Sequence, residues 1–276
     1  MDGAGGRHSS AQLTKALARV LRDGRLAALA TLVEAPTEHA SRVGAKILLE
    51  ENGELTGSTG DAGLDTAVAE QARAFLGSRS EARTFAVAEF APALEGWRGG
   101  RVLFERVEPE PHVVVCGAGH VGASLARLAR AVGYRVTLID DRADFVAPER
   151  FPEGGITLVA AREWAGPLKR AVATGRGVSV AVVTRGHNED EECLRAALEA
   201  RPDYVGMIGS RRRTNIVLAR LREAGVAEEI LREVRAPVGL DLGAVTPEEV
   251  ALSILAEIVV HRRGGTYAPL SAWRRE

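Results

Sequence analysis

The sequence is poor in cysteine and lysine and contains no long apolar run. Its two cysteines, Cys116 and Cys193, are too few for a disulfide framework or for a zinc site built from cysteines alone. No apolar stretch approaches the roughly 20 residues that cross a bilayer, and the polar, glycine-rich residues 1–10 lack the apolar core of a signal peptide. We therefore expect a cytoplasmic protein with no membrane partner.

An excess of charge of either sign is also missing. The 36 basic and 37 acidic residues nearly balance, and almost all of the basic residues are arginines. A general nucleic-acid surface requires a surplus of positive charge. The composition therefore predicts no nucleic-acid partner.

The length of 276 residues predicts two domains, because single hydrophobic cores seldom grow beyond about 250 residues. Pro109 and Pro111 interrupt helices and sheet pairing alike, so we place the boundary there. We expect residues 1–10 to be disordered, residues 11–108 to form a small α+β domain and residues 112–276 to form a second domain. In the first domain, helices are predicted at 11–22 and 64–76, and strands at 26–33, 46–50, 84–90 and 102–107.

Strand and helix signals alternate after the boundary, which is typical of a parallel sheet covered by helices. A last helix is predicted to run through Val260, with Thr246 as N-cap, Pro247 at the first helical position and Glu249 completing a capping box. The other predicted elements are strands at 113–116, 136–139, 156–159, 178–183 and 204–208, and helices at 123–132, 163–173, 189–200 and 212–224. We expect an α/β fold whose C-terminal domain is a Rossmann-like parallel sheet with helices on both faces.

A glycine-rich segment joins the first of these strands to its helix. Gly117 permits a tight turn, Gly119 lets the backbone approach a diphosphate, and Gly122 lets the helix pack on the sheet. Amides at the start of the helix face such a ligand as donors. Asp140 follows about 20 residues later, at the end of the next strand, as in dinucleotide-binding folds. We predict that the whole segment binds a nucleotide-like ligand: Gly117, Ala118, Gly119, His120, Val121 and Gly122.

Polar loops follow three other strands of the predicted sheet. Ligands of doubly wound sheets bind beyond the carboxyl ends of the strands, so these loops are expected to open on one edge. Arginine holds an oxyanion through paired hydrogen bonds. We predict a phosphate-bearing small molecule at this edge, bound by Asp140, Asp141, Arg142, Arg185, Gly186, His187, Asp190, Ser210 and either Arg211 or Arg212.

Several of these residues also have a purely structural interpretation, which the sequence leaves open. Asp140 either accepts hydrogen bonds from ribose hydroxyls or caps the following turn. His120 either faces the ligand or serves as a capping or packing imidazole. The arginines at 211–213 are also typical of a solvated helix face. Cys116 ends a buried strand and is assigned to the core rather than to a nucleophile or metal ligand.

These residues resemble the XdhC/CoxI family, the accessory proteins of xanthine dehydrogenase and related molybdenum hydroxylases. The resemblance extends from about Leu13 to beyond His261, and its motifs are specific in combination. They are residues 117–122 (GAGHVG), 140–142 (DDR), 185–190 (RGHNED), 206–213 (GMIGSRRR), 237–244 (PVGLDLGA) and 246–249 (TPEE).

The resemblance implies a role in enzyme maturation. The family is expected to bind the molybdenum cofactor, as molybdopterin or its dinucleotide, to protect it and to deliver it to an apo molybdenum hydroxylase. This implies a cofactor chaperone rather than an enzyme, with a Rossmann-like C-terminal domain and a separate N-terminal domain. The apolar, arginine-rich helix at 247–263 is a candidate surface for a homodimer.

Two segments differ from the family pattern. Many members carry a cysteine in a segment similar to Ser-x-Ser-Gly-Gly-Cys-x-Glu, where a thiolate is a suitable soft metal ligand. Here the matching residues 58–65 place Gly63 at the cysteine position, so no thiol is available there. The segment 41–46 resembles Pro-Arg-x-x-Gly-Ala, but Arg42 stands only two positions before Gly44. The phosphate-binding half keeps its motifs.

Two other functions remain open. The glycine fingerprint with Asp140 also fits an NAD(P)-dependent oxidoreductase. Hydride transfer needs a proton donor or acceptor beside the substrate, for which His187 and Asp190 are the nearest candidates, although no catalytic residue is identified. The absent thiol beside a retained Rossmann site fits a nucleotide-sensing regulatory protein. No metal ligands are predicted.

Overall fold

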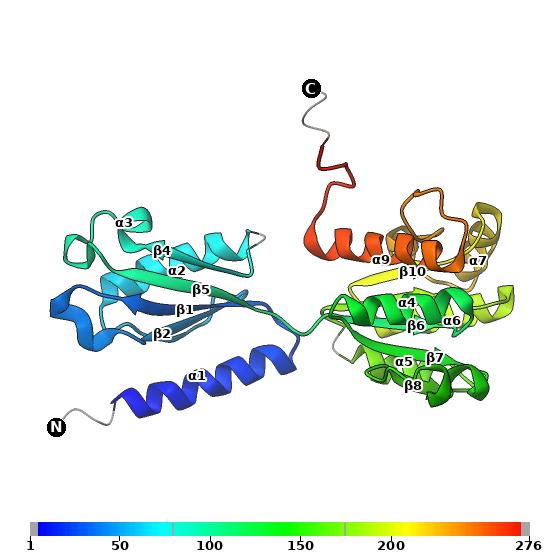
Figure 1. The fold of residues 1–276 in the computed structure, drawn as a ribbon, viewed down its shortest axis with the longest axis horizontal. Helices are drawn as coiled ribbons and strands as arrows, with labels where there is room; N and C mark the ends of the chain where they lie inside the picture. The colour runs from blue at the N-terminus through cyan, green and yellow to red at the C-terminus, as the bar shows by residue number, and fades with distance from the viewer. Residues whose placement is uncertain (1–4, 79, 174, 272–276) are drawn as a thin grey trace. The chain divides into compact units, whose positions relative to one another are not determined.

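The computed structural model describes residues 5–78, 80–173 and 175–271, apart from the side chains of residues 5–9 and of His187. The chain forms two compact units, Met1–Pro109 and Glu110–Glu276 (Figure 1). The division falls within the proline-containing segment 109–111.

The first unit is an antiparallel sheet with one helix on each face. Its strands follow the order β3-β2-β1-β5-β4. One face packs on helix α2 (Ala62–Leu76) and the other on helix α1 (Gly5–Arg22). Successive side chains of a strand point to opposite faces, so Ile47 and Leu49 pack with α2 while Leu48 packs with α1. The strands are β1 (Ala27–Glu34), β2 (Lys46–Glu50), β3 (Leu55–Gly57), β4 (Ala82–Ala86) and β5 (Arg101–Val107), with short helical turns at η1 (Thr37–Arg42), α3 (Val87–Phe90) and η2 (Glu95–Trp97).

Three predictions for this unit were wrong. Residues 5–10, expected to be disordered, belong to helix α1, while residues 1–4 lie outside the described residues. Packing of Leu13 and Val20 on the sheet stabilises this helix, and extending a formed helix adds one hydrogen bond for each residue fixed. The strand predicted at 84–90 ends at Ala86, where the chain turns into α3. The three-residue strand β3 was missed.

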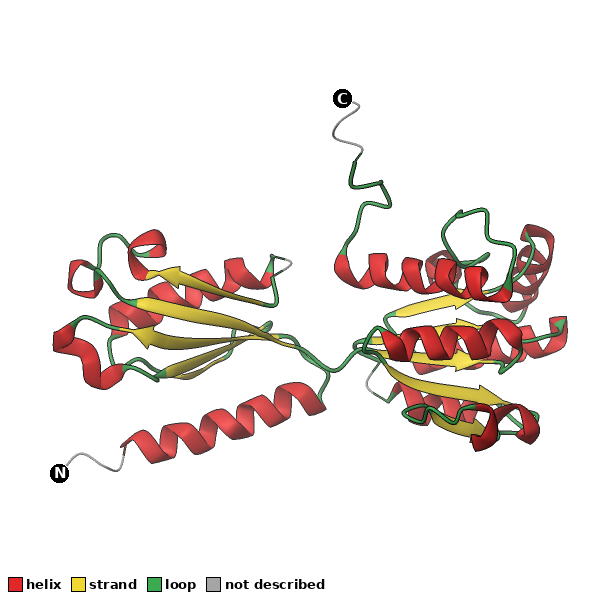
Figure 2. Ribbon diagram, viewed as in Figure 1, coloured by secondary structure: helices red, strands yellow, loops and turns green. Residues whose placement is uncertain are grey.

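The second unit is a parallel sheet with helices on both faces, which confirms the predicted fold class (Figure 2). Helices α4 and α9 cover one face, and α5, α6 and α7 cover the other. The strands are β6 (His112–Cys116), β7 (Arg135–Asp140), β8 (Thr157–Ala160), β9 (Val178–Val182) and β10 (Tyr204–Met207). The helices are α4 (His120–Ala131), α5 (Ala165–Val172), α6 (His187–Ala200), α7 (Arg211–Glu223), α8 (Glu228–Glu233) and α9 (Pro247–Arg263), with short turns at η3 (Ala143–Val146) and η4 (Pro148–Arg150).

The strand order β10-β9-β6-β7-β8 places the topological switch point beside β6. The chain first builds outward from β6 to β8, then returns to add β9 on the other side of β6. Ligands of such sheets bind beyond the carboxyl ends of the strands at this reversal. The turn after β6 is therefore the expected position of a ligand site.

Helix α9 begins as its sequence predicted. The Thr246 hydroxyl accepts a hydrogen bond from the Glu249 amide at 3.2 Å, and the Glu249 carboxylate accepts one from the Thr246 amide at 2.9 Å, with Pro247 at the first helical position. The helix runs through Val260, as predicted, and ends at Arg263. Helix α8 was not predicted. Among the described residues, no helix combines the length and apolar character needed to cross a membrane.

Candidate functional site

The turn after β6 is packed against the chain at Gly117 and Gly122 but borders open space at Gly119. Gly117 has a φ of 109°, and a Cβ built on it would lie 2.5 Å from the Val183 carbonyl oxygen. A Cβ on Gly122 would lie 1.8 Å from the Gly117 carbonyl oxygen. At Gly119, by contrast, a Cβ would meet no atom of the described chain within 4 Å. The first two glycines are required for packing, whereas Gly119 borders open space into which a ligand can reach.

Helix α4 starts at this open side without a cap of its own. Its N-cap, Gly119, provides no side-chain hydrogen bond, and its first turn contains no acidic residue. The first amides of an α-helix have no partner inside the helix, and the helix dipole favours an anion beside them. The start of α4 is thus suited to a phosphate, as the glycine spacing predicted.

The carboxylate of Asp140 fixes the backbone of this turn by a hydrogen bond. Only 1% of the residue is exposed, and Oδ2 accepts a hydrogen bond from the Ala118 amide at 2.5 Å. The Arg142 guanidinium binds both carboxylate oxygens at 2.9 Å, and its amide binds Oδ1 at 2.9 Å. Burial alone would raise the pKa of Asp140, but the Arg142 guanidinium and the two amides lower it overall. Because both oxygens are engaged within the chain, the ribose role predicted for Asp140 is disfavoured.

Arg185 connects the loops on either side of the turn. Its Nη2 lies 2.8 Å from Asp141 in the loop after β7, and its Nε lies 3.1 Å from Glu189 in the first turn of α6. Strands β7 and β9 flank β6, so this pair of contacts spans the end of the central strand. The structure therefore brings together the loops that the sequence placed at one edge.

The carboxylate of Asp190 is not available to a ligand at this edge. The residue is completely buried, and its carboxylate accepts hydrogen bonds from the Thr184 hydroxyl and, at 2.5 Å, from Nε of Arg213. It fixes the start of α6 to that of α7, so a role in ligand binding is disfavoured for it. Sequence reasoning missed this use of Arg213. The side chain of His187 lies outside the described residues, and Gly186 is the N-cap of α6.

The start of α7 divides its three arginines between two roles. Ser210 caps the helix by accepting a hydrogen bond from the Arg213 amide at 3.2 Å, which occupies its hydroxyl. Arg211 and Arg212 are exposed, and no hydrogen bond or ion pair is found for either side chain among the described residues. Positive charge at a helix N-terminus opposes the helix dipole unless an anion compensates it. The prediction that either Arg211 or Arg212 contacts a phosphate therefore stays open.

A cavity of about 390 Å³ lies beside this edge, and its lining residues are not among the predicted site residues. It lies between the end of β10, the loop 239–244 and the start of α9. Two hydrogen bonds hold the loop. The Gly239 amide donates to the Glu257 carboxylate at 2.6 Å, and the Ser253 hydroxyl donates to the Leu240 carbonyl at 2.5 Å. The motif at 237–244 was the signal that could have identified it.

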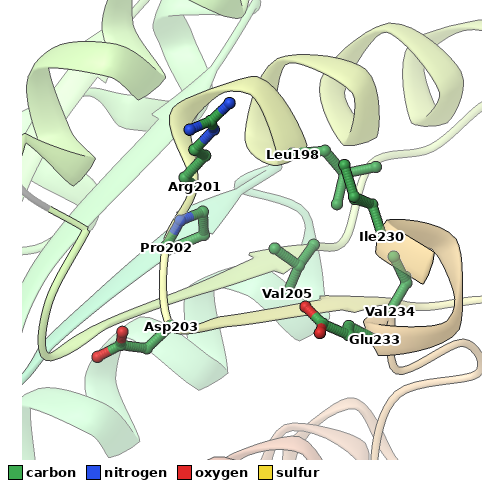
Figure 3. Close-up of a pocket in the computed structure, with 8 residues that line it drawn as sticks. All are labelled: Leu198, Arg201, Pro202, Asp203, Val205, Ile230, Glu233 and Val234. Carbon is green, nitrogen blue, oxygen red and sulfur yellow. The ribbon is translucent and has the colours of Figure 1, made fainter. Parts of the chain in front are cut away.

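A second cavity, of about 310 Å³, lies at the other end of β10 (Figure 3). Val205, Ile230 and Val234 form its apolar wall, while Arg201 and Glu233 contribute charged groups. The described residues that line it include none of the predicted site residues. It is therefore separate from the site at the carboxyl edge.

The thiols offer no metal site. Cys116 and Cys193 are both buried in the core. Burial raises the pKa of Cys193, and the neighbouring Cys116 adds to that effect. In the part of the chain that the structure describes, no three His, Cys, Asp or Glu residues gather in a way that would hold a metal ion.

The two segments of the first unit that depart from the XdhC/CoxI pattern lie together. A Cβ on Gly60 would be 3.7 Å from the Arg42 guanidinium. A Cβ on Gly63 would be 3.3 Å from both the Asp61 carboxylate and the Leu94 side chain. These contacts are tight, so a side chain at position 63 requires its neighbours to move slightly. The structure explains a small residue there but supplies no substitute for a thiolate among the residues it describes.

Comparison with known proteins identifies two matching families. The XdhC Rossmann domain matches residues 113–258, and the XdhC and CoxI family matches residues 20–86. These ranges fall one in each unit of the fold. The range 113–258 covers more than half of the 276 residues and includes the glycine-rich turn.

Three curated relatives match parts of the chain. The uncharacterized protein YqeB of Escherichia coli K12 is 37% identical over 54% of this chain and 27% of its own length. A probable subunit of xanthine dehydrogenase from Bacillus subtilis 168 is 28% identical over 59% of this chain and 46% of its own. The molybdenum cofactor insertion chaperone PaoD of E. coli K12 is 34% identical over 33% of this chain and 29% of its own. The matches span less than half the length of each relative.

Proposed function

Because the chain belongs to the XdhC and CoxI family, we propose that it is an accessory protein of a molybdenum hydroxylase, which binds the molybdenum cofactor and passes it to the apo-enzyme. The names of two relatives, one a probable component of xanthine dehydrogenase and the other a molybdenum cofactor insertion chaperone, support this direction. The cofactor is the cargo of this reaction, as molybdopterin or its dinucleotide form.

One observation carries the proposal: helix α4 begins at an open glycine with neither a side-chain cap nor an acidic first turn. The phosphate of the pterin tail fits here, accepting hydrogen bonds from the amides of residues 119–121. Arg211 and Arg212, exposed at the start of α7, provide positive charge for a second phosphate or for a nucleotide. The Asp140–Arg142 pair holds the turn in place without contacting the ligand.

The first experiment identifies the ligand directly. The full chain is purified from a host that makes molybdopterin, denatured, and the released small molecules are analysed by mass spectrometry. We expect a molybdopterin or its dinucleotide in near-stoichiometric amount. Release of a nicotinamide nucleotide instead would refute the proposal in favour of an oxidoreductase.

Paired variants test the binding geometry. Gly119→Glu places a carboxylate in the open space before α4, where no described atom lies within 4 Å of the added Cβ. We expect it to abolish cofactor binding with little effect on folding. Val132→Glu adds the same charge at the exposed far end of the helix and should leave binding unchanged. Equal binding by both variants would contradict the proposed site.

A second candidate function follows from Gly63. A retained phosphate site without the family's thiol favours a nucleotide-sensing regulatory protein. In that case nucleotides would change an association of the protein, and no pterin would copurify. Size-exclusion chromatography with and without nucleotides distinguishes the two candidates, and it also tests the candidate homodimer. The oxidoreductase alternative loses support, because its ribose-binding carboxylate is engaged by Arg142.

A further inference from the structure

The amino edge of the parallel sheet, opposite the proposed site, contains a polar corner. On the face covered by α5, His112, Arg135, Thr137 and Thr157 are neighbours on strands β6, β7 and β8. Further along the same face the inward residues are apolar, Val114 being one of them. Strands buried on both faces normally consist of apolar residues throughout. The polar corner is thus a departure that packing alone does not explain.

This corner lines a cavity of about 300 Å³. Helix α5 covers it with the small side chains of Pro167 and Ala171, which leave the space unfilled, and Val159 and Arg170 complete the lining. Pockets for small molecules begin at about this volume. The cavity has both an apolar wall and polar groups, as ligand sites commonly do.

His112 brings a buried imidazole to the lining of the cavity. The residue is 1% exposed, and its Nε2 lies 2.9 Å from the Thr137 hydroxyl. Burial, together with the positive charge of Arg135, lowers the pKa of His112 to about 4, although a hydrogen bond to the Ala171 backbone acts in the opposite direction. The imidazole is therefore neutral and adds a polar ring to the lining of the cavity.

Two cations provide the charge. Arg135 and Arg170 are both exposed, and neither forms an ion pair within the described part of the chain. The described residues that line the cavity include no acidic side chain. Two guanidinium groups at one cavity match a phosphate group, which accepts paired hydrogen bonds from each.

We propose that this cavity binds a phosphorylated small molecule, with its phosphate on Arg135 and Arg170 and its organic part against Val159 and Pro167. The site is distinct from the glycine-rich turn, which lies at the other edge of the sheet. It does not depend on the proposed function. A regulatory or accessory ligand can therefore act on this unit while the carboxyl edge is occupied.

Calorimetric titration of the full chain with inorganic phosphate and with glycerol 3-phosphate tests the proposal. Arg135→Gln and Arg170→Gln should each weaken binding of glycerol 3-phosphate at least tenfold, because each removes one of two charged donors. Lys169→Gln is the matched control: it removes a charge from the adjacent position of α5 but lies outside the cavity lining. We expect it to change the affinity less than twofold. Glycerol 3-phosphate should bind more tightly than inorganic phosphate, since only the ester has an organic part.

Three results would overturn the proposal. Undetectable binding of both probes would exclude the site, and equal weakening by Lys169→Gln would indicate a general effect of charge. Unchanged binding in both arginine variants would place the phosphate elsewhere, including at the turn after β6. As a second readout, the ring ¹⁵N signals of His112 should shift when glycerol 3-phosphate is added, and unchanged signals would remove this residue from the site.

Discussion

Helices α4 and α7 both begin at the carboxyl edge of the parallel sheet, but they differ in how their first turns are satisfied. Ser210 caps α7, and Arg213 in its first turn binds the buried Asp190. Helix α4 begins at Gly119 with no side-chain cap and no acidic residue in its first turn. The difference shows that polar residues at this edge can hold the fold together rather than bind a ligand. Of these two helix starts, that of α4 is the one for which the described residues provide no side-chain cap.

The largest expected effect on stability comes from breaking the ion pair between Asp190 and Arg213, which fixes the start of α7. Asp190→Asn leaves the guanidinium of Arg213 without its buried carboxylate, which we expect to destabilise the protein by about 3 kcal/mol. Urea unfolding measures this change. Asp141→Asn, which breaks a partly exposed ion pair with Arg185, should cost at most about 1 kcal/mol. Equal costs would mean that burial does not distinguish the two pairs.

Crowding of the glycine-rich turn is expected to have the next largest effect. Gly122→Ala places a methyl group where a Cβ would lie 1.8 Å from the Gly117 carbonyl oxygen, so helix and strand must separate. We expect a loss of about 1–3 kcal/mol, as for other overpacked sites. The thermal unfolding midpoint should fall accordingly. A midpoint like that of the wild type would show that this contact is not needed.

Asp140, which holds the open turn, should make the stability of the protein depend on pH. Its pKa is lower in the folded protein than in the unfolded chain, so its contribution to stability is complete above about pH 4 and is lost as the pH falls towards its folded pKa. Replacement by Asn should flatten the acid side of the stability profile. Arg142→Gln should do the same, because it removes the guanidinium that lowers this pKa. Unfolding by urea at a series of acidic pH values tests both variants.

The smallest effect on stability should come from converting α4 into a helix like α7. Gly119→Ser supplies the hydroxyl cap that the helix lacks, and we expect a gain of about 0.3 kcal/mol in the absence of ligand. The same hydroxyl competes for the amides that the ligand uses, so affinity for the phosphate-bearing ligand should fall. Higher stability with undiminished affinity would show that these amides do not bind the ligand.

Most of the fold could be predicted from the sequence, because it depends on patterns that extend over many residues. The apolar runs of β6 and β9 and the capping box of α9 are local signals, and the structure contains each of them. Strand β3, with three residues, and helix α8, with six, are too short to show a period. Residues 5–10 were misjudged because composition alone does not reveal packing further along a helix.

The site was less predictable, because it depends on which side chains meet across the fold. The sequence correctly indicated which loops share one edge, and Arg185 joins two of them. It left open a structural role for Asp140, whose partner Arg142 is only two residues away. It could not show that Asp190 faces an arginine of this chain, because Arg213 is 23 residues away. Both carboxylates have the residue type and position of ligand contacts, and both are engaged in holding the loops.

The ion pair of Arg185 with Asp141 has a consequence for the proposed binding of a phosphate: Arg185 would have to exchange its carboxylate partner for the phosphate. The pair joins the loops of the two strands that flank β6, next to the turn where the ligand is proposed to bind. A phosphate bound as proposed would compete with Asp141 for the same guanidinium. Since one charge contact would replace another, Arg185 would add little to the net affinity. The affinity would then depend on the neutral amides at the start of α4 and on Arg211 and Arg212.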